Sequence, residues 1–131
     1  MIGDDLRQRT RRFAMDVIDL CLEIGNDDLA RIVRPQLLRA GTGLAANYRA
    51  AGWARSSREF ASKLSVVIEE ADESELWLDV LETKRREPAA AVSRLRQESR
   101  ELRAIFIKSR ATTLEKLRRR RRSDPRAGDA A

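Results

Sequence analysis

Apolar residues recur at helical spacing along most of the chain, and this pattern restricts the fold more than any other feature of the sequence. In the first segment, about residues 4–24, one helical face carries Phe13, Val17, Leu20, Cys21 and Ile24 at steps of three or four. A second stripe consists of Met15, Ile18 and Leu22. An apolar arc this wide predicts a helix that is buried on two sides.

The second helical segment spans about residues 29–52. Its apolar stripe consists of Val33, Leu37, Gly41, Leu44 and Tyr48. Pro35 either begins the main part of this helix at its first position or bends it. Gly41 and Gly43 lie inside the pattern, and each costs about 1 kcal/mol relative to alanine in a helix. We therefore expect a neighbouring helix to approach closely at this point.

The third segment begins with a helix-start signal. Ser56 and Glu59 have the spacing of a capping box, in which each side chain binds a backbone donor of the first turn. The helix is predicted to reach about Arg85, which gives a length of roughly 45 Å. Its apolar stripe consists of Phe60, Leu64, Val67, Ala71, Leu78 and Leu81.

The fourth segment follows Pro88, which suits the first position of a helix. Its apolar face consists of Val92, Leu95, Leu102, Ile105 and Phe106. On the polar face, Arg94 with Glu98 and Glu115 with Arg119 have the spacing of ion pairs within one helix.

These four segments predict an all-α protein with one domain. No segment has the alternation of a strand, and a chain of 131 residues fits a single domain. Short links between long amphipathic helices make neighbouring helices antiparallel. We therefore predict an antiparallel up-down four-helix bundle over residues 1–117, followed by a basic, flexible tail over residues 118–131.

The chemistry of the chain excludes most catalytic sites. There is no histidine and only one cysteine, Cys21, which lies in an apolar run where cysteine behaves as a small hydrophobe. Catalytic triads and structural zinc sites need more of these residues, and no phosphate-binding glycine loop is present. We expect a non-enzymatic protein with no cofactor, no metal and no catalytic residue.

The location of the protein is predicted from what its sequence lacks. No apolar stretch approaches the roughly 20 residues that span a membrane. Residues 1–5 lack the basic and then apolar pattern of a signal peptide. The prediction is a cytoplasmic protein that does not bind a membrane.

The excess positive charge lies at the C-terminal end. The chain carries a formal charge of +6, of which residues 116–131 contribute +5. Arg118, Arg119, Arg120, Arg121 and Arg122 are adjacent and can neutralise several phosphates. The run therefore predicts either a nucleic-acid-binding tail or a solubilising terminus, and no aromatic residue lies within it for base stacking.

Residues 69–75 form an acidic stretch, with Asp79 one turn beyond. Like charges at helical spacing oppose the helix by a few tenths of a kcal/mol each, so the stretch needs compensation. Three explanations are open: arginines of the second helix or of another subunit, a hard metal ion held by oxygen atoms, or a solvated face.

Aromatic residues and excess apolar surface suggest contacts between copies of the chain. Tyr48, Trp53 and Trp77 are residue types that are common in cores and at protein interfaces. The first and third helices also carry more apolar surface than one inner face requires. Both features favour self-association.

Four stretches resemble a known family: residues 12–17, the run from Gln36 to Arg49, residues 58–64 (Arg-Glu-Phe-Ala-Ser-Lys-Leu) and residues 69–78. Together they are similar to the four-helix-bundle proteins related to the bacterial large-subunit ribosomal RNA intervening-sequence proteins. The resemblance covers about residues 9–112 and excludes the arginine run. The family is similar in fold to the accessory variability-determinant proteins of diversity-generating retroelements.

The resemblance implies a bundle that assembles as a homopentameric ring, with relatives linked to nucleic acid. The polar positions of the family motif fall on Arg39, Asn47, Arg49, Glu69 and Glu73. The family often has serine where this chain has Ala40 and Gly43, and glutamate where it has Ala50. These departures leave any shared polar network near Ala50 in doubt.

The sequence therefore supports a non-enzymatic homo-oligomer that binds RNA or DNA through arginines. The alternative from a different class is a scaffold that binds only protein. A carboxylate-metal enzyme is a third hypothesis.

Overall fold

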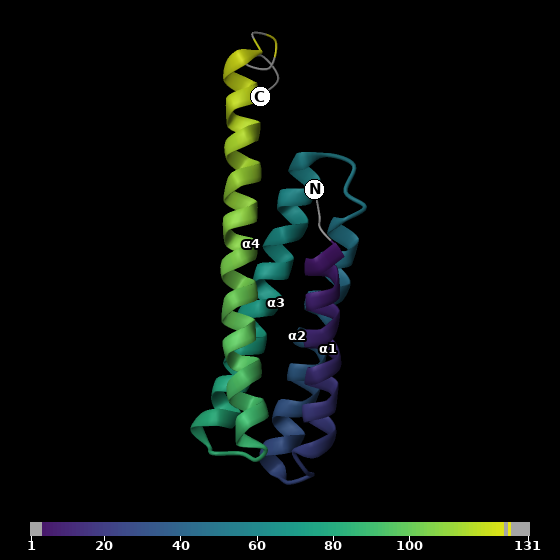
Figure 1. Cartoon of the computed structure of the whole chain (residues 1–131), viewed down its shortest axis with the longest axis vertical. Helices are drawn as coiled ribbons and strands as arrows, with labels where there is room; N and C mark the ends of the chain where they lie inside the picture. The colour runs from purple at the N-terminus through teal and green to yellow at the C-terminus, as the bar shows by residue number, and fades with distance from the viewer. Residues whose placement is uncertain (1–3, 125, 127–131) are drawn as a thin grey trace.

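The computed structural model describes residues 4–124 and 126, and it consists of four helices. They are α1 (Asp4–Glu23), α2 (Asp28–Ala51), α3 (Ser57–Thr83) and α4 (Ala89–Ser123). Consecutive helices run in opposite directions and are joined by short loops (Figure 1). No strand occurs among the described residues. The prediction of an up-down four-helix bundle is confirmed.

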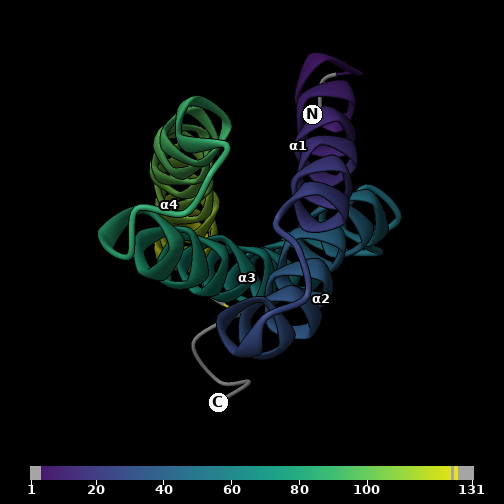
Figure 2. The same cartoon turned by 90° about the horizontal axis from the view of Figure 1, so that it is seen from below.

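Each helix packs against the next one in the chain, and the contact between the last helix, α4, and the first, α1, is weak. Seen end-on, α2 and α3 lie next to each other, with α1 beside α2 and α4 beside α3 (Figure 2). α4 packs mainly against α3 and only slightly against α1. The bundle is therefore tightly packed at three of its helix interfaces and more open at the fourth.

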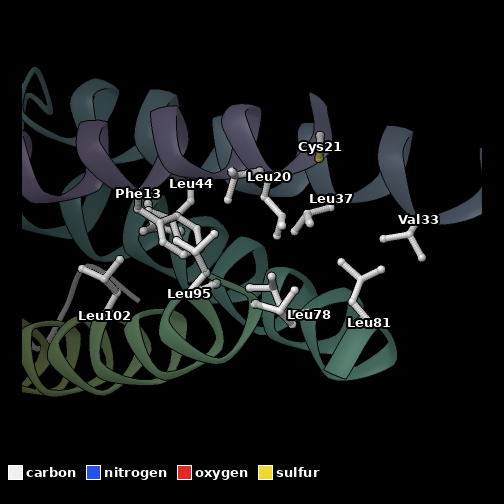
Figure 3. Close-up of a cluster of buried hydrophobic side chains, with 14 of the residues drawn as sticks. Phe13, Leu20, Cys21, Val33, Leu37, Leu44, Leu78, Leu81, Leu95 and Leu102 are labelled. Carbon is white, nitrogen blue, oxygen red and sulfur yellow. The ribbon is translucent and has the colours of Figure 1, made fainter. Parts of the chain in front are cut away.

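The predicted apolar stripes meet in a common core (Figure 3). The fully buried side chains from the four helices include Val17, Leu37, Leu44, Leu64, Leu78, Leu102 and Phe106. Tyr48 and Phe106 are in contact, with ring centroids 5.1 Å apart. Cys21 belongs to the same core, and burial raises the pKa of its thiol to about 11, so at neutral pH it is a protonated, unreactive group.

The second apolar stripe of α1 is not buried within this chain. Met15 is 44% exposed and Leu22 is 78% exposed. The stripe was predicted to be buried on a second side, and one copy of the bundle supplies no helix there. These side chains therefore remain available for contact with another molecule.

The helix ends follow most of the predicted signals. Asp27 caps α2 by accepting a hydrogen bond from the backbone N–H of Ala30 at 3.0 Å. Ser56 caps α3 by accepting from the N–H of Glu59 at 3.1 Å, whereas the Glu59 carboxylate accepts from the N–H of Arg55 instead of Ser56. The capping box is thus formed with its return bond shifted by one residue.

The two prolines differ in their positions relative to the helices. α2 begins at Asp28 and passes through Pro35, so this proline does not begin the helix. Pro88 is the residue immediately before α4 rather than its first helical residue.

The two glycines of α2 allow close contacts, as predicted. A Cβ atom on Gly41 would lie 2.9 Å from a methyl carbon of Val17 in α1, closer than side chains pack. A Cβ atom on Gly43 would lie 3.1 Å from the carboxylate of Glu70 in α3. Gly41 therefore fits α1 against α2, and Gly43 makes room for an acidic side chain.

Ion pairs connect α1 to α4. The Arg9 guanidinium binds both carboxylate oxygens of Glu98, at 2.8 and 2.6 Å. Arg94 binds Asp16 at 3.1 Å. The predicted pair of Arg94 with Glu98 is therefore wrong, because each side chain reaches across to α1 rather than along its own helix.

Candidate functional site

The arginine run lies on a helix that extends beyond the rest of the bundle (Figure 1). Residues 118–122 form the last turns of α4, and all five side chains are exposed. The tail predicted over residues 118–131 thus begins with helical residues, and its residues 125 and 127–131 lie outside the described residues. Arginine is a good helix former, and positive charge at a helix C-terminus interacts favourably with the helix dipole.

Few of these arginines have an acidic partner. Arg118 and Arg119 lie 3.5 and 3.4 Å from the carboxylate of Glu115 one turn earlier, which confirms the predicted pair of Glu115 with Arg119. Among the described residues, Arg120, Arg121 and Arg122 make no ion pair. The end of α4 therefore presents uncompensated positive charge.

Other cations gather at the same end of the bundle. In an up-down bundle the start of α1, the end of α2, the start of α3 and the end of α4 lie together. We call the segments 4–12, 46–60 and 108–126 the basic end; they contain 16 basic and five acidic residues. The remaining segments of the bundle, residues 13–45 and 61–107, contain 11 basic and 15 acidic residues. The basic end thus has a net positive charge, and the rest of the bundle has a net negative charge.

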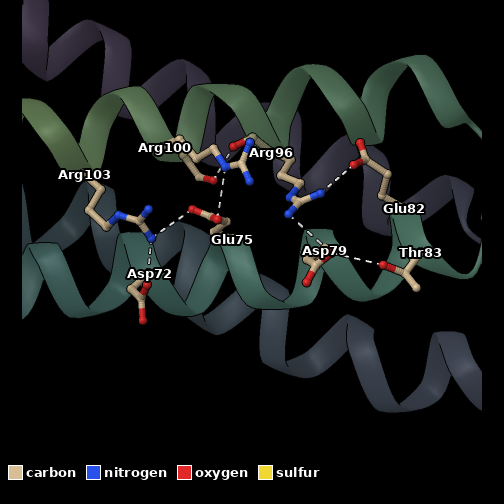
Figure 4. Close-up of polar contacts among 9 residues, drawn as sticks. Asp72, Glu75, Asp79, Glu82, Thr83, Arg96, Arg100 and Arg103 are labelled. Carbon is tan, nitrogen blue, oxygen red and sulfur yellow. Dashed lines mark hydrogen bonds and ion pairs between the residues drawn. The ribbon is translucent and has the colours of Figure 1, made fainter.

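Away from the basic end, most arginines are paired with carboxylates. Between α3 and α4, Arg96 binds Glu82 at 2.6 Å and Asp79 at 3.4 Å. One turn on, Arg100 binds Glu75 at 3.1 Å (Figure 4).

The same ladder continues with Arg103, which binds Asp72 at 2.7 Å and Glu75 at 2.9 Å. On the other side of α3, Arg39 of α2 pairs with Glu73. The compensation predicted from arginines of the second helix is therefore correct for Glu73. The larger set of partners on α4 was missed, because spacing within α3 does not show which helix lies opposite. No three carboxylates of the described residues come together as a metal site.

The polar positions of the sequence motif do not form one site. Arg39 and Glu73 are an ion pair, and Asn47 donates a hydrogen bond to the carbonyl oxygen of Gly43 at 2.8 Å within α2. Arg49 is exposed and lines a pocket between α1 and α2. Glu69 is exposed and has no ion-pair partner among the described residues. Only one pair of the five predicted positions is in contact.

Glu70 differs from its acidic neighbours in its surroundings, and the spacing of the acidic stretch did not indicate this difference. Its carboxylate lies over Gly43, and one oxygen is buried without a hydrogen-bond partner in the described structure. The nearest cation is Arg39, at 3.9 Å. Burial raises the pKa of Glu70 above its usual value, while the positive charge of Arg39 opposes this shift. The glycine at position 43 was the signal that could have indicated it.

The aromatic residues divide into two groups. Tyr48 is buried, and burial raises the pKa of its phenol against the opposing charge of Arg7. Trp77 is partly buried against the core. Trp53, in the loop between α2 and α3, is 80% exposed and lies at the basic end. The expectation of a core or interface position is therefore met by Tyr48 and Trp77, whereas Trp53 faces solvent in this chain.

No helix in the described part of the chain is both long enough and apolar enough to cross a lipid bilayer.

The bundle is similar to a solved protein. No family model matches the chain, and no curated protein matches it. Among solved structures, it is similar to a protein of unknown function from the S23 ribosomal protein family of Bacteroides thetaiotaomicron, with 26% identity and a TM-score of 0.68. The match covers 79% of this chain and 95% of that chain. The similarity therefore extends over the bundle and indicates a related helical family.

Proposed function

We propose that this chain is a non-enzymatic bundle protein that assembles into a homo-oligomeric ring, a pentamer by family resemblance, and binds RNA or DNA through its basic end. The sequence resemblance to the ribosomal RNA intervening-sequence proteins supports this proposal. The observation that carries the nucleic-acid part is the separation of charge along the bundle: 16 basic and five acidic residues at the basic end, against 11 basic and 15 acidic residues in segments 13–45 and 61–107.

The affinity of a basic surface for a polyanion depends on how many of its cations are free of carboxylate partners, as well as on their number. Arginines that already bind carboxylates, such as Arg96 and Arg103, gain little from a second anion. Arg120, Arg121 and Arg122 make no ion pair with the described residues and are exposed on a projecting helix. Such side chains can displace the counterions of a phosphate backbone, which is the main source of affinity for nucleic acid.

Trp53 adds a contact that charge cannot provide. Aromatic side chains on which bases stack contribute about 1–3 kcal/mol per base. Trp53 is 80% exposed in a loop that continues into Arg55 and Arg58. Its position at the basic end favours an unpaired, single-stranded segment as the bound form.

Self-assembly is supported by two exposed apolar regions on different sides of the bundle. The α1–α2 groove is lined by Met15, Ile18 and Ala45, and the α3–α4 groove by Ile68, Ile107 and Leu114. α1 and α2 lie on one side of the bundle, and α3 and α4 on the other (Figure 2). A contact between two different faces is heterologous, and such contacts close into rings.

The nucleic-acid part is tested by removing the arginine run. A chain ending at Leu117 lacks Arg118–Arg122 and Arg126, and a control ending at Asp124 keeps the five adjacent arginines. We expect the slope of log affinity against log salt for single-stranded RNA to fall by up to about 4 on the first deletion. Equal slopes for the full chain and the chain ending at Leu117 would remove the run from the proposal.

The assembly part is tested with one variant on each face. Leu22→Glu alters the face that contains the α1–α2 groove, and Ile107→Glu alters the α3–α4 groove. Light scattering after size exclusion should report monomers for each variant alone. Mixed together, they should form dimers, because each retains one intact face. Monomers of the unaltered chain would contradict the ring.

The alternative function is a scaffold that binds only protein. Nuclease treatment before light scattering separates it from the main proposal. Loss of co-purified nucleic acid on treatment supports nucleic-acid binding, whereas a specific protein partner retained after treatment supports the scaffold.

A further inference from the structure

A pocket of about 520 Å³ opens at the basic end, where three parts of the chain meet. Four cationic side chains line it: Arg7 from α1, Arg55 from the α2–α3 loop, and Lys116 and Arg120 from α4. We call it the four-cation pocket. Segments more than 100 residues apart in the sequence thus bring their positive charges to one concavity.

The four-cation pocket has no negative charge of its own. Its lining includes no aspartate or glutamate, and none of the four cations makes an ion pair with the described residues. Four other grooves on the surface each include at least one carboxylate: Asp4, Asp124, Glu23 with Glu87, and Glu115. Most arginines in the middle of the bundle are also paired. Of these five grooves, the four-cation pocket is the one whose lining includes no carboxylate.

Like charges that are held near each other destabilise the folded chain unless an anion offsets them. The pocket also offers neutral donors, since the hydroxyl groups of Ser56 and Ser57 line it. Cations with hydroxyl donors in a concave site suit a compact anion that accepts several hydrogen bonds. A phosphate group has this shape and accepts such bonds on all its free oxygens.

The charge of the pocket distinguishes two kinds of phosphate. A phosphodiester within a strand carries one negative charge and extends in two directions, which suits the exposed, consecutive arginines of Arg118–Arg122. A phosphate monoester carries about −1.5 to −2 near neutral pH and has one attachment. Four cations around one concavity match the monoester better.

We propose that the four-cation pocket binds a phosphate monoester, the group found at a phosphorylated end of a nucleic-acid strand. The inference rests on the proposed function for the origin of the phosphate, and on the four-cation pocket for its chemistry. The protein would then recognise strand ends, with Trp53 beside the pocket in the same loop as Arg55.

The experiment compares two short single-stranded RNAs of identical sequence, one with a 5′-phosphate and one with a 5′-hydroxyl, binding to the full chain. We expect the phosphorylated strand to bind about tenfold more tightly. In the pocket variant Arg55→Gln with Lys116→Gln, this ratio should fall to about one. The control variant Arg121→Gln with Arg122→Gln removes the same charge outside the pocket, so it should weaken both strands equally and keep the ratio.

Four outcomes decide the matter. A ratio that is lost only in the pocket variant supports the inference. Equal binding of both strands to the unaltered chain overturns the inference and leaves the proposed function standing. If neither strand binds but inorganic phosphate binds and the pocket variant abolishes that binding, the proposed function fails and the pocket is a site for small phosphates. If neither the strands nor inorganic phosphate binds, both proposals fail.

Discussion

Both halves of α4 contain several arginines, but the surroundings of these arginines differ. Residues 89–106 contain the arginines at 94, 96, 100 and 103, and each is paired with a carboxylate of α1 or α3. Residues 107–123 contain even more basic side chains, yet none makes an ion pair with another helix among the described residues. The buried residues of α4 all lie in the first half, ending at Phe106. The first half contains the buried residues of α4, and the last turns of the second half extend beyond the bundle (Figure 1).

This difference shows that the number of arginines does not indicate what they do. In the first half the same residue type joins helices, and in the second half it remains available for an external anion. The deciding factor is whether a carboxylate on a neighbouring helix lies within reach. Three experiments test the contrast between the halves, and a fourth tests a carboxylate of α3.

The largest effect is expected from deleting a buried side chain in the first half. Leu102→Ala removes a fully buried side chain and should lower the free energy of unfolding by about 2–5 kcal/mol. Leu117→Ala in the second half should cost less than about 1 kcal/mol, because Leu117 is only partly buried. Urea denaturation followed by circular dichroism measures both. Similar losses would mean that the halves are equally part of the fold.

The second effect concerns binding. Replacing Arg120, Arg121 and Arg122 together with glutamine should weaken binding to single-stranded RNA by about a hundredfold at low salt and leave the urea midpoint unchanged. Fluorescence anisotropy of a labelled strand measures the affinity. A large fall in stability with unchanged affinity would reverse the roles assigned to the two halves.

The third effect is the counterpart in the first half. Arg103→Gln breaks the pairs with Asp72 and Glu75. It should lower the free energy of unfolding by about 1 kcal/mol, since one partner is largely buried and the other is exposed. RNA affinity should not change. Arg119→Gln is the matched control in the second half, where we expect a smaller change in stability and a measurable loss of binding.

The smallest effect concerns a carboxylate whose compensation is incomplete. Because the pKa of Glu70 is raised in the folded state, the folded chain holds its proton more tightly than the unfolded chain. Its contribution therefore becomes less favourable as pH rises from the usual carboxyl value through the raised one. Glu70→Gln should increase stability by a few tenths of a kcal/mol at neutral pH.

That gain should disappear as the pH falls below the usual carboxyl range, because Glu70 is then neutral in both states. Urea midpoints at neutral and acidic pH measure it. A variant that is less stable than the unaltered chain at neutral pH would show that the pair with Arg39 outweighs burial.

Much of the fold could be predicted from periodicity, and most of the pairing could not. The stripes through Val17, Leu37, Leu64 and Leu102 identify the buried faces, because burial of one helical face imposes a regular spacing. Ion pairs between helices depend on which polar faces meet, and spacing within one helix contains no such information. This is why Arg94 and Glu98 were assigned to each other although each pairs with α1.

The candidate site was predictable only in part. The charge of Arg118–Arg122 is evident in the sequence. The composition of residues 118–131 favours a flexible tail, whereas residues 118–123 are helical. The four-cation pocket could not be predicted, because its members are far apart in the chain and meet only after folding. Trp53 is not in the core, because a loop at the end of a bundle leaves its side chain nothing to pack against within one chain. Its predicted place at an interface stays a prediction.

The contact at Gly41 also sets the alignment of two helices along the bundle axis. Val17 fits against α2 only where a side chain is missing, so a shift of α1 by one turn, about 5.4 Å, would bring Val17 against a larger residue. Such a shift would also change the position of Arg7 relative to Arg55, because Arg7 would move with α1 while Arg55 stays at the end of α2. The missing side chain at Gly41 thus helps to determine how the cations of α1 and of the α2–α3 loop are positioned relative to each other at the basic end.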